Sequence, residues 1–336
     1  MRNLLLHVFW FDRLYERGVA TRTRPGFLRC GMSTVEHWRS ESINVRSSQK
    51  SSLSPRGPRV LMAVSIPCDE DFQAQHATPT AQFYFQLRGG SGTPLDAVGR
   101  IGSLCNRYPG VLNVHLNCFS RRLDHASAEK QFKRLSSCRG VTVSSVPGMK
   151  GLFWKHALRP HDTAPYDFIW LADADLDVTD PSFNLARLVR DMRVSNAALA
   201  QPRIKELAGG GRSTDIKHLR FTSNFPDNCS AVSTDVVEVM APFFRSLAWS
   251  ITHRELLSVL PDELLRRTDW GITQTWCGVV RRLTAGPACA LLHEGIVHFD
   301  EHLIERAGLD NLTTQSGDWQ KSRWEVLVRV PGSQTK

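Results

Sequence analysis

Short apolar runs alternate along this chain with longer stretches of helical periodicity. The runs predict strands at residues 60–66, 111–116, 141–146, 168–172, 197–201 and 290–298. The amphipathic stretches predict helices at residues 94–108, 126–135, 152–158, 183–193, 238–249 and 255–265. Unbroken apolar runs are typical of strands covered on both faces, and strands separated by helices pair mostly in parallel. The pattern therefore predicts an α/β fold, a single domain with a mostly parallel open sheet flanked by helices.

The pattern also sets the expected domain limits. Residues 1–58 are rich in Arg and Ser and are interpreted as a basic leader or tail, residues 59–310 as the folded domain, and residues 311–336 as an extension. The apolar run at residues 4–11 is far shorter than the roughly 20 residues that span a bilayer, so no transmembrane helix is expected. A signal-peptide core, a membrane-surface helix and an organelle transit peptide all remain open.

The charge distribution argues against a nucleic-acid-binding protein. The chain carries a net charge of +9, but residues 1–59 hold 11 Lys and Arg against 4 Asp and Glu. That leaves 31 basic and 29 acidic side chains for the remainder, so the expected domain is nearly neutral. Phosphate-backbone affinity needs basic side chains gathered on one surface, and we expect no nucleic-acid partner.

The eight cysteines lack the spacing of a zinc site. Cys118 and Cys289 have apolar neighbours, and we expect them to be buried free thiols. Sequons at Asn228 and Asn311 would accept glycans in the secretory pathway. The secretory pathway, including the Golgi, is the predicted location, with an organelle or the cytoplasm as alternatives.

An acidic cluster follows the apolar run at residues 168–172, and comprises Asp173, Asp175, Asp177 and Asp180. Open sheets bind ligands beyond the carboxyl ends of their strands, where this cluster is expected to lie. Crowded like charges need a compensating cation or solvent, and Mg²⁺ or Mn²⁺ would share such carboxylates with a substrate diphosphate. Asp180 is expected to cap the helix that follows, and the role of Asp177 stays open.

Two further features bear on function. A haloacid-dehalogenase-like phosphatase also places such an acidic pair after an apolar strand, with the first Asp as nucleophile. In that class the motif sits on the opening strand, whereas here several strands precede it.

The long loop at residues 205–228, with three consecutive glycines, is a candidate lid.

Five ordered segments carry a family resemblance: KGLFWKHAL at residues 150–158, YDFIWLADADL at 166–176, AQP at 200–202, VEVMAPFF at 237–244 and IVH at 296–298. They resemble the plant and algal family of domain of unknown function 707, which looks like a branch of the GT-A glycosyltransferases. The resemblance spans about residues 60–305, and it implies a GT-A-like single domain with a Rossmann-like nucleotide-binding half.

This resemblance implies a metal-dependent transferase that moves a sugar from a nucleoside-diphosphate sugar to a hydroxyl of a glycan or other acceptor. It implies that Asp175 binds Mn²⁺ or Mg²⁺, that Asp173 contacts the ribose or the metal, and that His298 completes the metal site. From its apolar neighbours alone, His298 would be an ordinary core residue. Lys150 and Lys155 are candidates to approach the diphosphate, although lysines on a helix are usually solvated.

The catalytic base is the point at which the sequence departs from the family. The resemblance implies a Trp-Gly-Leu-Asp motif that carries this acid, and the matching stretch ends in Thr273. Threonine cannot deprotonate the acceptor hydroxyl. The sequence therefore leaves Asp269 or Glu238 as the candidate base, or a protein that keeps the fold without catalysis.

Overall fold

The computed structural model describes residues 57–66, 96–119, 129–130, 133–205, 229–234, 236–267, 269, 272–281 and 287–299. Nearly all of the expected leader, the glycine-containing loop and the C-terminal extension lie outside these residues. Within the described ranges, no helix is both long and apolar enough to cross a membrane.

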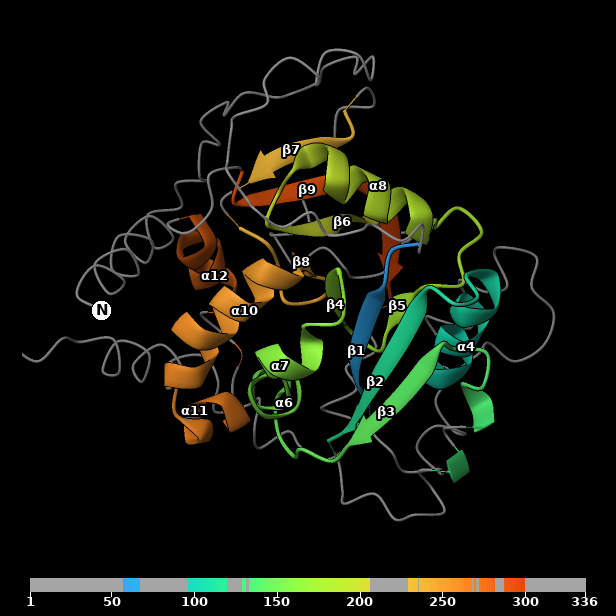
Figure 1. Cartoon of the computed structure of the whole chain (residues 1–336), viewed down its shortest axis with the longest axis horizontal. Coiled ribbons are helices and arrows are strands. Elements are labelled where there is room, and N and C mark those ends of the chain that lie inside the picture. Colours follow the sequence, from blue (N-terminus) through green and yellow to red (C-terminus); the bar gives the residue numbers. More distant parts are fainter. Residues whose placement is uncertain are drawn as a thin grey trace, which may run out of the picture.

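The described strands form one nine-stranded sheet (Figure 1). The order is β3-β2-β1-β4-β8-β6-β9-β5, with β7 also paired to β9. The strands are β1 (Val60–Ile66), β2 (Leu112–Cys118), β3 (Gly140–Ser144), β4 (Phe168–Ala172), β5 (Leu176–Asp177), β6 (Leu199–Lys205), β7 (Ala231–Thr234), β8 (Phe243–Arg245) and β9 (Cys289–His298).

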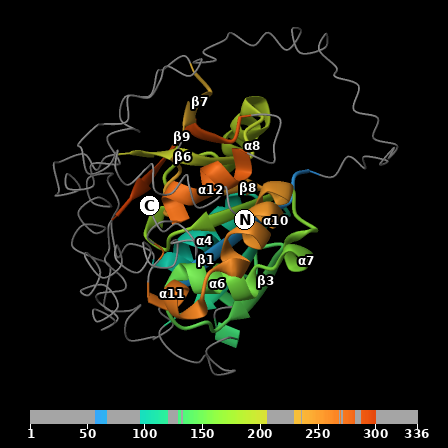
Figure 2. The same cartoon turned by 90° about the vertical axis from the view of Figure 1, so that its left-hand side faces the viewer.

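Helices pack on both sides of this sheet (Figures 1 and 2). They are α4 (Ala97–Arg107), α6 (Lys150–Ala157), α7 (Pro160–Thr163), α8 (Leu185–Ser195), α10 (Ser246–Glu255), the 3-10 turn η3 (Leu257–Val259), α11 (Asp262–Arg267) and α12 (Ile272–Arg281). The expected α/β architecture, an open sheet flanked by helices, is confirmed.

The sheet is parallel in one half and mixed in the other. The β3-β2-β1-β4 half is parallel throughout, whereas β8 runs antiparallel to both of its neighbours, β4 and β6. β2 and β3 lie on one side of β1, and the chain then returns to place β4 on its other side. Such a reversal of strand order opens a crevice at the carboxyl ends of the two strands, and Asp173 follows β4 directly at that point.

Side-chain alternation divides the core between the two faces of the sheet. In β4, Phe168, Trp170 and Ala172 join the core under α4 and α8, whereas Ile169 and Leu171 join the core under α6, α10, α11 and α12. The period of two places successive side chains on opposite faces. The central strands are therefore buried on both sides, which explains why they are continuous apolar runs in the sequence.

Two predicted helices are wrong in part. The one expected at residues 255–265 is divided between the turn η3 and α11, and the other is wrong over most of its length. Residues 238–249 were expected to form one helix, but Phe243–Arg245 is β8 and the helix begins only at Ser246. Phe243 and Phe244 each pair with strands on both sides, and their rings pack on opposite faces of the sheet. Cross-strand packing has overridden the local periodicity here.

The expected cap is also wrong. The helix after the acidic cluster begins at Leu185, and its capping side chain is Asn184, which accepts from the N–H of Arg187. Asp180 instead accepts from the N–H and the hydroxyl of Ser182, which closes a local turn.

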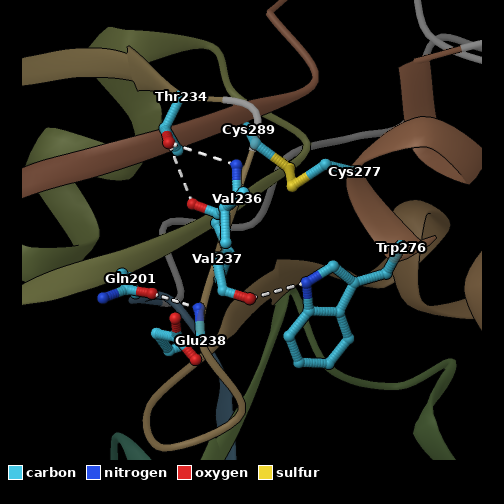
Figure 3. Close-up of a disulfide and its surroundings, with 8 residues drawn as sticks. All are labelled: Gln201, Thr234, Val236, Val237, Glu238, Trp276, Cys277 and Cys289. Atoms are coloured by element: carbon cyan, nitrogen blue, oxygen red, sulfur yellow. Dashed lines mark hydrogen bonds between the residues drawn. A yellow bond between two sulfur atoms is a disulfide. The ribbon is translucent and has the colours of Figure 1, made fainter. Parts of the chain in front are cut away.

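The expectation of free thiols is wrong as well. Cys105 pairs with Cys138, and Cys277 pairs with Cys289, which joins α12 to β9 (Figure 3). Cys118 is also disulfide-bonded, and none of the described cysteines is free. Apolar neighbours predict burial of a sulfur atom, but they carry no information on whether a second sulfur lies opposite.

Candidate metal centre

Asp173, Asp175 and His298 converge at the carboxyl end of β4. One ligand atom from each lies within 4.8 Å of the other two. The Nε2 atom of His298 is 3.1 Å from Oδ1 of Asp175. Two carboxylate oxygens and an imidazole nitrogen at such spacing can all reach one ion after small rotations of the side chains.

A short antiparallel ladder brings the histidine to the aspartates. β5 pairs with the end of β9, so that Leu176 lies opposite His298. The N–H of Phe299 then donates to the carbonyl of Asp175 at 2.9 Å. The register of this ladder therefore sets the distance between the candidate metal ligands of the two segments.

The backbone of Asp173 is held from the other side by the segment that precedes β8. Its N–H donates to the carbonyl of Met240 at 2.8 Å, and the N–H of Leu171 donates to the carbonyl of Pro242 at 2.9 Å. The acidic turn is thus fixed between β9 and this segment.

Lys150, the first residue of α6, neutralises part of the acidic charge. Its Nζ atom donates to both oxygens of Asp173, at 2.6 and 2.9 Å, and lies 3.8 Å from Oδ2 of Asp269. Burial alone would lower the pKa of Lys150, but Asp173 and Asp269 outweigh it and the pKa is raised. Lys150 is therefore a fixed positive charge at the edge of the site.

Asp173 has an unusual affinity for a proton. Burial raises its pKa to about 6, and Lys150 offsets only part of that effect, while the neighbouring Asp175 raises the pKa further. A carboxyl group in this state gains from a divalent cation, because the cation would supply the charge compensation that burial removes.

The donor set fits Mn²⁺ or Mg²⁺. Carboxylate oxygens suit both ions, and the imidazole is a softer ligand that Mn²⁺ accepts more readily than Mg²⁺. In such a site Asp173, Asp175 and His298 would hold the ion, and Lys150 would lie beside it.

The described contacts of Lys155 are to residues outside this cluster. Its Nζ atom donates to the carbonyl of Leu260 and to Asp262, each at 2.7 Å. These contacts tie α6 to the start of α11. The described contacts of Lys155 thus differ from those of Lys150, and its assignment to the diphosphate stays a prediction.

The two candidate bases occupy different surroundings. Asp269 lies next to Lys150 and so reaches the acidic cluster through that ammonium group. Glu238 lies in the segment between β7 and β8, where its N–H donates to Oε1 of Gln201 (Figure 3). Trp276 fixes the same segment by donating its indole N–H to the carbonyl of Val237 at 2.8 Å. Thr273 is buried in the first turn of α12.

Asp177 is placed by its own turn. Its Oδ1 atom accepts from the N–H and the hydroxyl of Thr179. It was left open from the sequence, and it is not part of the three-residue cluster described above.

Sequence reasoning missed Arg100 in α4. Its Nη2 atom donates to the carbonyl of Ala174, between the two aspartates, at 2.6 Å. Its guanidinium also lies over the ring of Phe299, 5.1 Å from the centroid. An arginine at an otherwise apolar helix position was the one available signal, since Val98, Ile101 and Leu104 surround it on the buried face.

The fold and this cluster define an open α/β sheet protein with an acidic, histidine-containing site at its topological switch point. The chain belongs to the family described as protein of unknown function (DUF707), which it matches over residues 123–315. A comparison with curated proteins finds no match.

Solved structures with similarity include TarS of S. aureus in complex with UDP, at 11% identity and a TM-score of 0.41, covering 71% of this chain and 60% of that one. The mannosyltransferase PcManGT of Pyrobaculum calidifontis, in complex with GDP-Man and Mn²⁺, matches at 11% identity and 0.39, covering 73% and 57%. Glucosyl-3-phosphoglycerate synthase of Mycobacterium tuberculosis, in complex with phosphoglyceric acid, matches at 16% identity and 0.40, covering 82% of each chain.

Proposed function

We propose that this protein is a divalent-metal-dependent glycosyltransferase of the GT-A type that uses a nucleoside-diphosphate sugar as donor and a hydroxyl group as acceptor. The observation that carries the proposal is the convergence of Asp173, Asp175 and His298 at the switch point of the sheet. Asp173 and Asp175 belong to one segment and His298 to another that is far along the sequence, so the fold brings them together.

The charges around the site suit a departing diphosphate. A bound Mn²⁺ or Mg²⁺ would supply Lewis-acid stabilisation of the negative charge that develops on the leaving group. Lys150 would add a second positive charge, because its ammonium is already held beside Asp173. Preorganised charges of this kind contribute more inside a protein than in water, since little reorganisation is needed as the reaction proceeds.

Asp269 is the better placed of the two candidate bases. Its carboxylate lies 3.8 Å from the Lys150 ammonium, which also binds the proposed metal ligand Asp173. We assign Asp269 the role of accepting the proton from the acceptor hydroxyl as it attacks the sugar.

A protein that binds a nucleotide without transferring the sugar is the second candidate. Thr273 favours it, because a buried threonine stands where the family resemblance places the acid. Binding and turnover must therefore be measured separately.

Thermal unfolding with a panel of nucleoside diphosphates and their sugars, with and without Mn²⁺, tests the binding step. We expect at least one nucleotide to raise the unfolding temperature only when Mn²⁺ is present. Lys150→Met should weaken this stabilisation. Lys155→Met on the same helix tests the other candidate lysine, and we expect a smaller effect, since its ammonium contacts Leu260 and Asp262. If no nucleotide stabilises the wild-type protein with metal, the proposal fails.

Product analysis then separates the two candidates and the phosphatase alternative. The transferase is supported if the wild type releases nucleoside diphosphate from a nucleotide sugar. Asp269→Asn should lose this release and still bind the nucleotide sugar. Binding without release supports the non-catalytic protein. Release of phosphate from a phosphomonoester would support the phosphatase instead.

We further propose that the protein works in the secretory pathway, including the Golgi. Disulfides persist in oxidising compartments, and none of the described cysteines is free. The tagged full-length protein should fractionate with these membrane-bound compartments. Its electrophoretic mobility should shift when N-linked glycans are removed. Recovery of the tagged chain in the cytosol would contradict this location.

A further inference from the structure

A buried arginine connects the two segments that supply the metal ligands. Arg100 is only 5% exposed, and its Nη2 atom donates to the carbonyl of Ala174 at 2.6 Å. Ala174 lies between Asp173 and Asp175. A charge-assisted bond of this length constrains the backbone of the acidic turn.

The same guanidinium contacts the segment of the histidine. Its central carbon lies 5.1 Å from the centroid of the Phe299 ring, and Phe299 directly follows His298. Phe299 in turn donates its N–H to the carbonyl of Asp175. Arg100 therefore contacts both halves of the cluster from α4, on the sheet face opposite Lys150 and α6.

Burying a guanidinium costs desolvation free energy, so an apolar residue would serve α4 better if packing were the only requirement. The helix itself is well anchored without Arg100. Asp96 caps its first turn through the N–H of Gly99, and Val98, Ile101 and Leu104 fill the core beneath it.

A second arginine on the same helix provides an internal comparison. Arg107 lies two turns further along α4, and it donates to the carbonyls of Val178 and Asp180. These acceptors belong to the same acidic segment but lie beyond the metal ligands. The two arginines thus make the same kind of bond to the same segment, one at the proposed metal centre and the other past it.

We propose that Arg100 is a positioning residue for the metal centre, which holds the acidic turn and the His298 segment at ligand distance by contacting Ala174 and Phe299 together. This inference rests on the proposed metal site. Outer-shell contacts that orient ligands of a metal commonly change its affinity by about 10- to 100-fold when they are removed.

Two effects of Arg100 on a cation have opposite signs. A buried positive charge near the site repels a divalent ion, so its removal would tighten binding if electrostatics alone mattered. Loss of positioning would weaken binding. The direction of the change therefore identifies which effect dominates, and the positioning role requires weaker binding.

The test is a titration of the full-length wild-type protein and its variants with Mn²⁺, in which electron paramagnetic resonance measures the free ion. We expect Arg100→Met to weaken Mn²⁺ affinity by about 10- to 100-fold. Arg100→Lys should give a smaller loss, because an ammonium can reach the carbonyl of Ala174 but offers no planar face to Phe299. Arg107→Met should keep wild-type Mn²⁺ affinity, whatever its effect on the unfolding temperature of the metal-free protein.

The outcomes separate this inference from the proposed function. If the wild type binds no Mn²⁺, the metal centre is wrong and the role of Arg100 falls with it. If the wild type binds and Arg100→Met binds equally or more tightly, only the positioning role is overturned. An equal loss in Arg107→Met would also overturn it, since the effect would then reflect the anchoring of α4. Arg100→Lys keeps the test available if the Met variant does not fold.

Discussion

His298 and Asp175 face each other across the end of the sheet, with Nε2 and Oδ1 3.1 Å apart. Their contact depends on the pairing of β5 with β9, which sets Leu176 opposite His298. A shift of this ladder by one residue would turn the histidine to the other face of the sheet. The geometry of the candidate metal centre therefore depends on the register of the short β5–β9 pairing.

The first prediction concerns the metal ligands. Asp175→Asn and His298→Gln should each lower Mn²⁺ affinity by more than about 100-fold, which exceeds the effect of losing an outer-shell contact. Asp177→Asn is the matched control from the same segment, since its Oδ1 atom is engaged by Thr179. Calorimetric titration with Mn²⁺ checks this, and an equal loss in Asp177→Asn would contradict the assignment.

The second prediction concerns pH and metal binding. Burial raises the pKa of Asp173 to about 6, and a metal binds only the ionised carboxylate. Mn²⁺ affinity should therefore be highest well above pH 6, where Asp173 is ionised, and fall as the pH drops through about 6. The measurement is Mn²⁺ affinity at a series of pH values, and an affinity that stays constant between pH 7 and 5 would contradict the prediction.

The stability of the metal-free protein should respond to Asp173 in the opposite sense. The pKa is raised on folding, so the folded state holds the proton more tightly than the unfolded chain between about pH 4 and 6. The contribution of Asp173 to the free energy of unfolding should decrease as the pH rises through this window. Asp173→Asn should remove that contribution, and urea unfolding across the window measures it.

The third prediction concerns His115 in β2. Burial lowers its pKa to about 4, although the nearby Asp162 raises it, and the ring contacts the hydroxyl of Ser144 at 3.1 Å. The unfolded chain binds a proton near pH 6.5, so stability should be lost as the pH falls from 6.5 towards 4, by up to about 3 kcal/mol. His115→Gln should flatten this part of the stability profile. His161→Gln, which replaces an exposed imidazole, is the comparison variant for the general effect of losing a histidine.

The fourth prediction concerns the disulfides. Cys277 and Cys289 are separated by 12 positions and Cys105 and Cys138 by 33. Chain-entropy arguments give a loss of about 3 kcal/mol when the first pair is replaced by serine and about 4 kcal/mol for the second. Denaturant unfolding of the two double variants measures these losses. A wild-type midpoint in both variants, unchanged by reductant, would show that the bonds do not stabilise the fold.

Replacement of the first pair should also affect the site. The Cys277–Cys289 bond joins α12 to the start of β9, the strand that ends at His298 (Figure 3). The Cys277→Ser/Cys289→Ser variant should therefore lose more Mn²⁺ affinity than the Cys105→Ser/Cys138→Ser variant, despite its smaller expected loss of stability. The same Mn²⁺ titration measures both.

Local patterns in the sequence determined those elements in which a single feature, an apolar run or an acidic pair, is strong enough to identify them. The apolar runs of β1 and β4 were predicted at their observed limits, because strands buried on both faces consist almost entirely of apolar residues. The acidic pair after β4 was recognised because carboxylates so close together need a partner. The family resemblance, and not the apolar neighbours of His298, indicated that histidine.

Only the tertiary structure decided which distant groups meet. β8 was mistaken for helix because Phe243 and Phe244 gain their stability from neighbouring strands and not from local periodicity. The pairing of Cys277 with Cys289, and the contact of Arg100 with Ala174 and Phe299, are likewise long-range relationships. The sequence by itself determined which residues can bind a metal. The packing of α4, α6 and β9 around the end of β4 decided which of them come together. The reason is that side-chain contacts depend on the register and burial of the elements, which the local sequence does not encode.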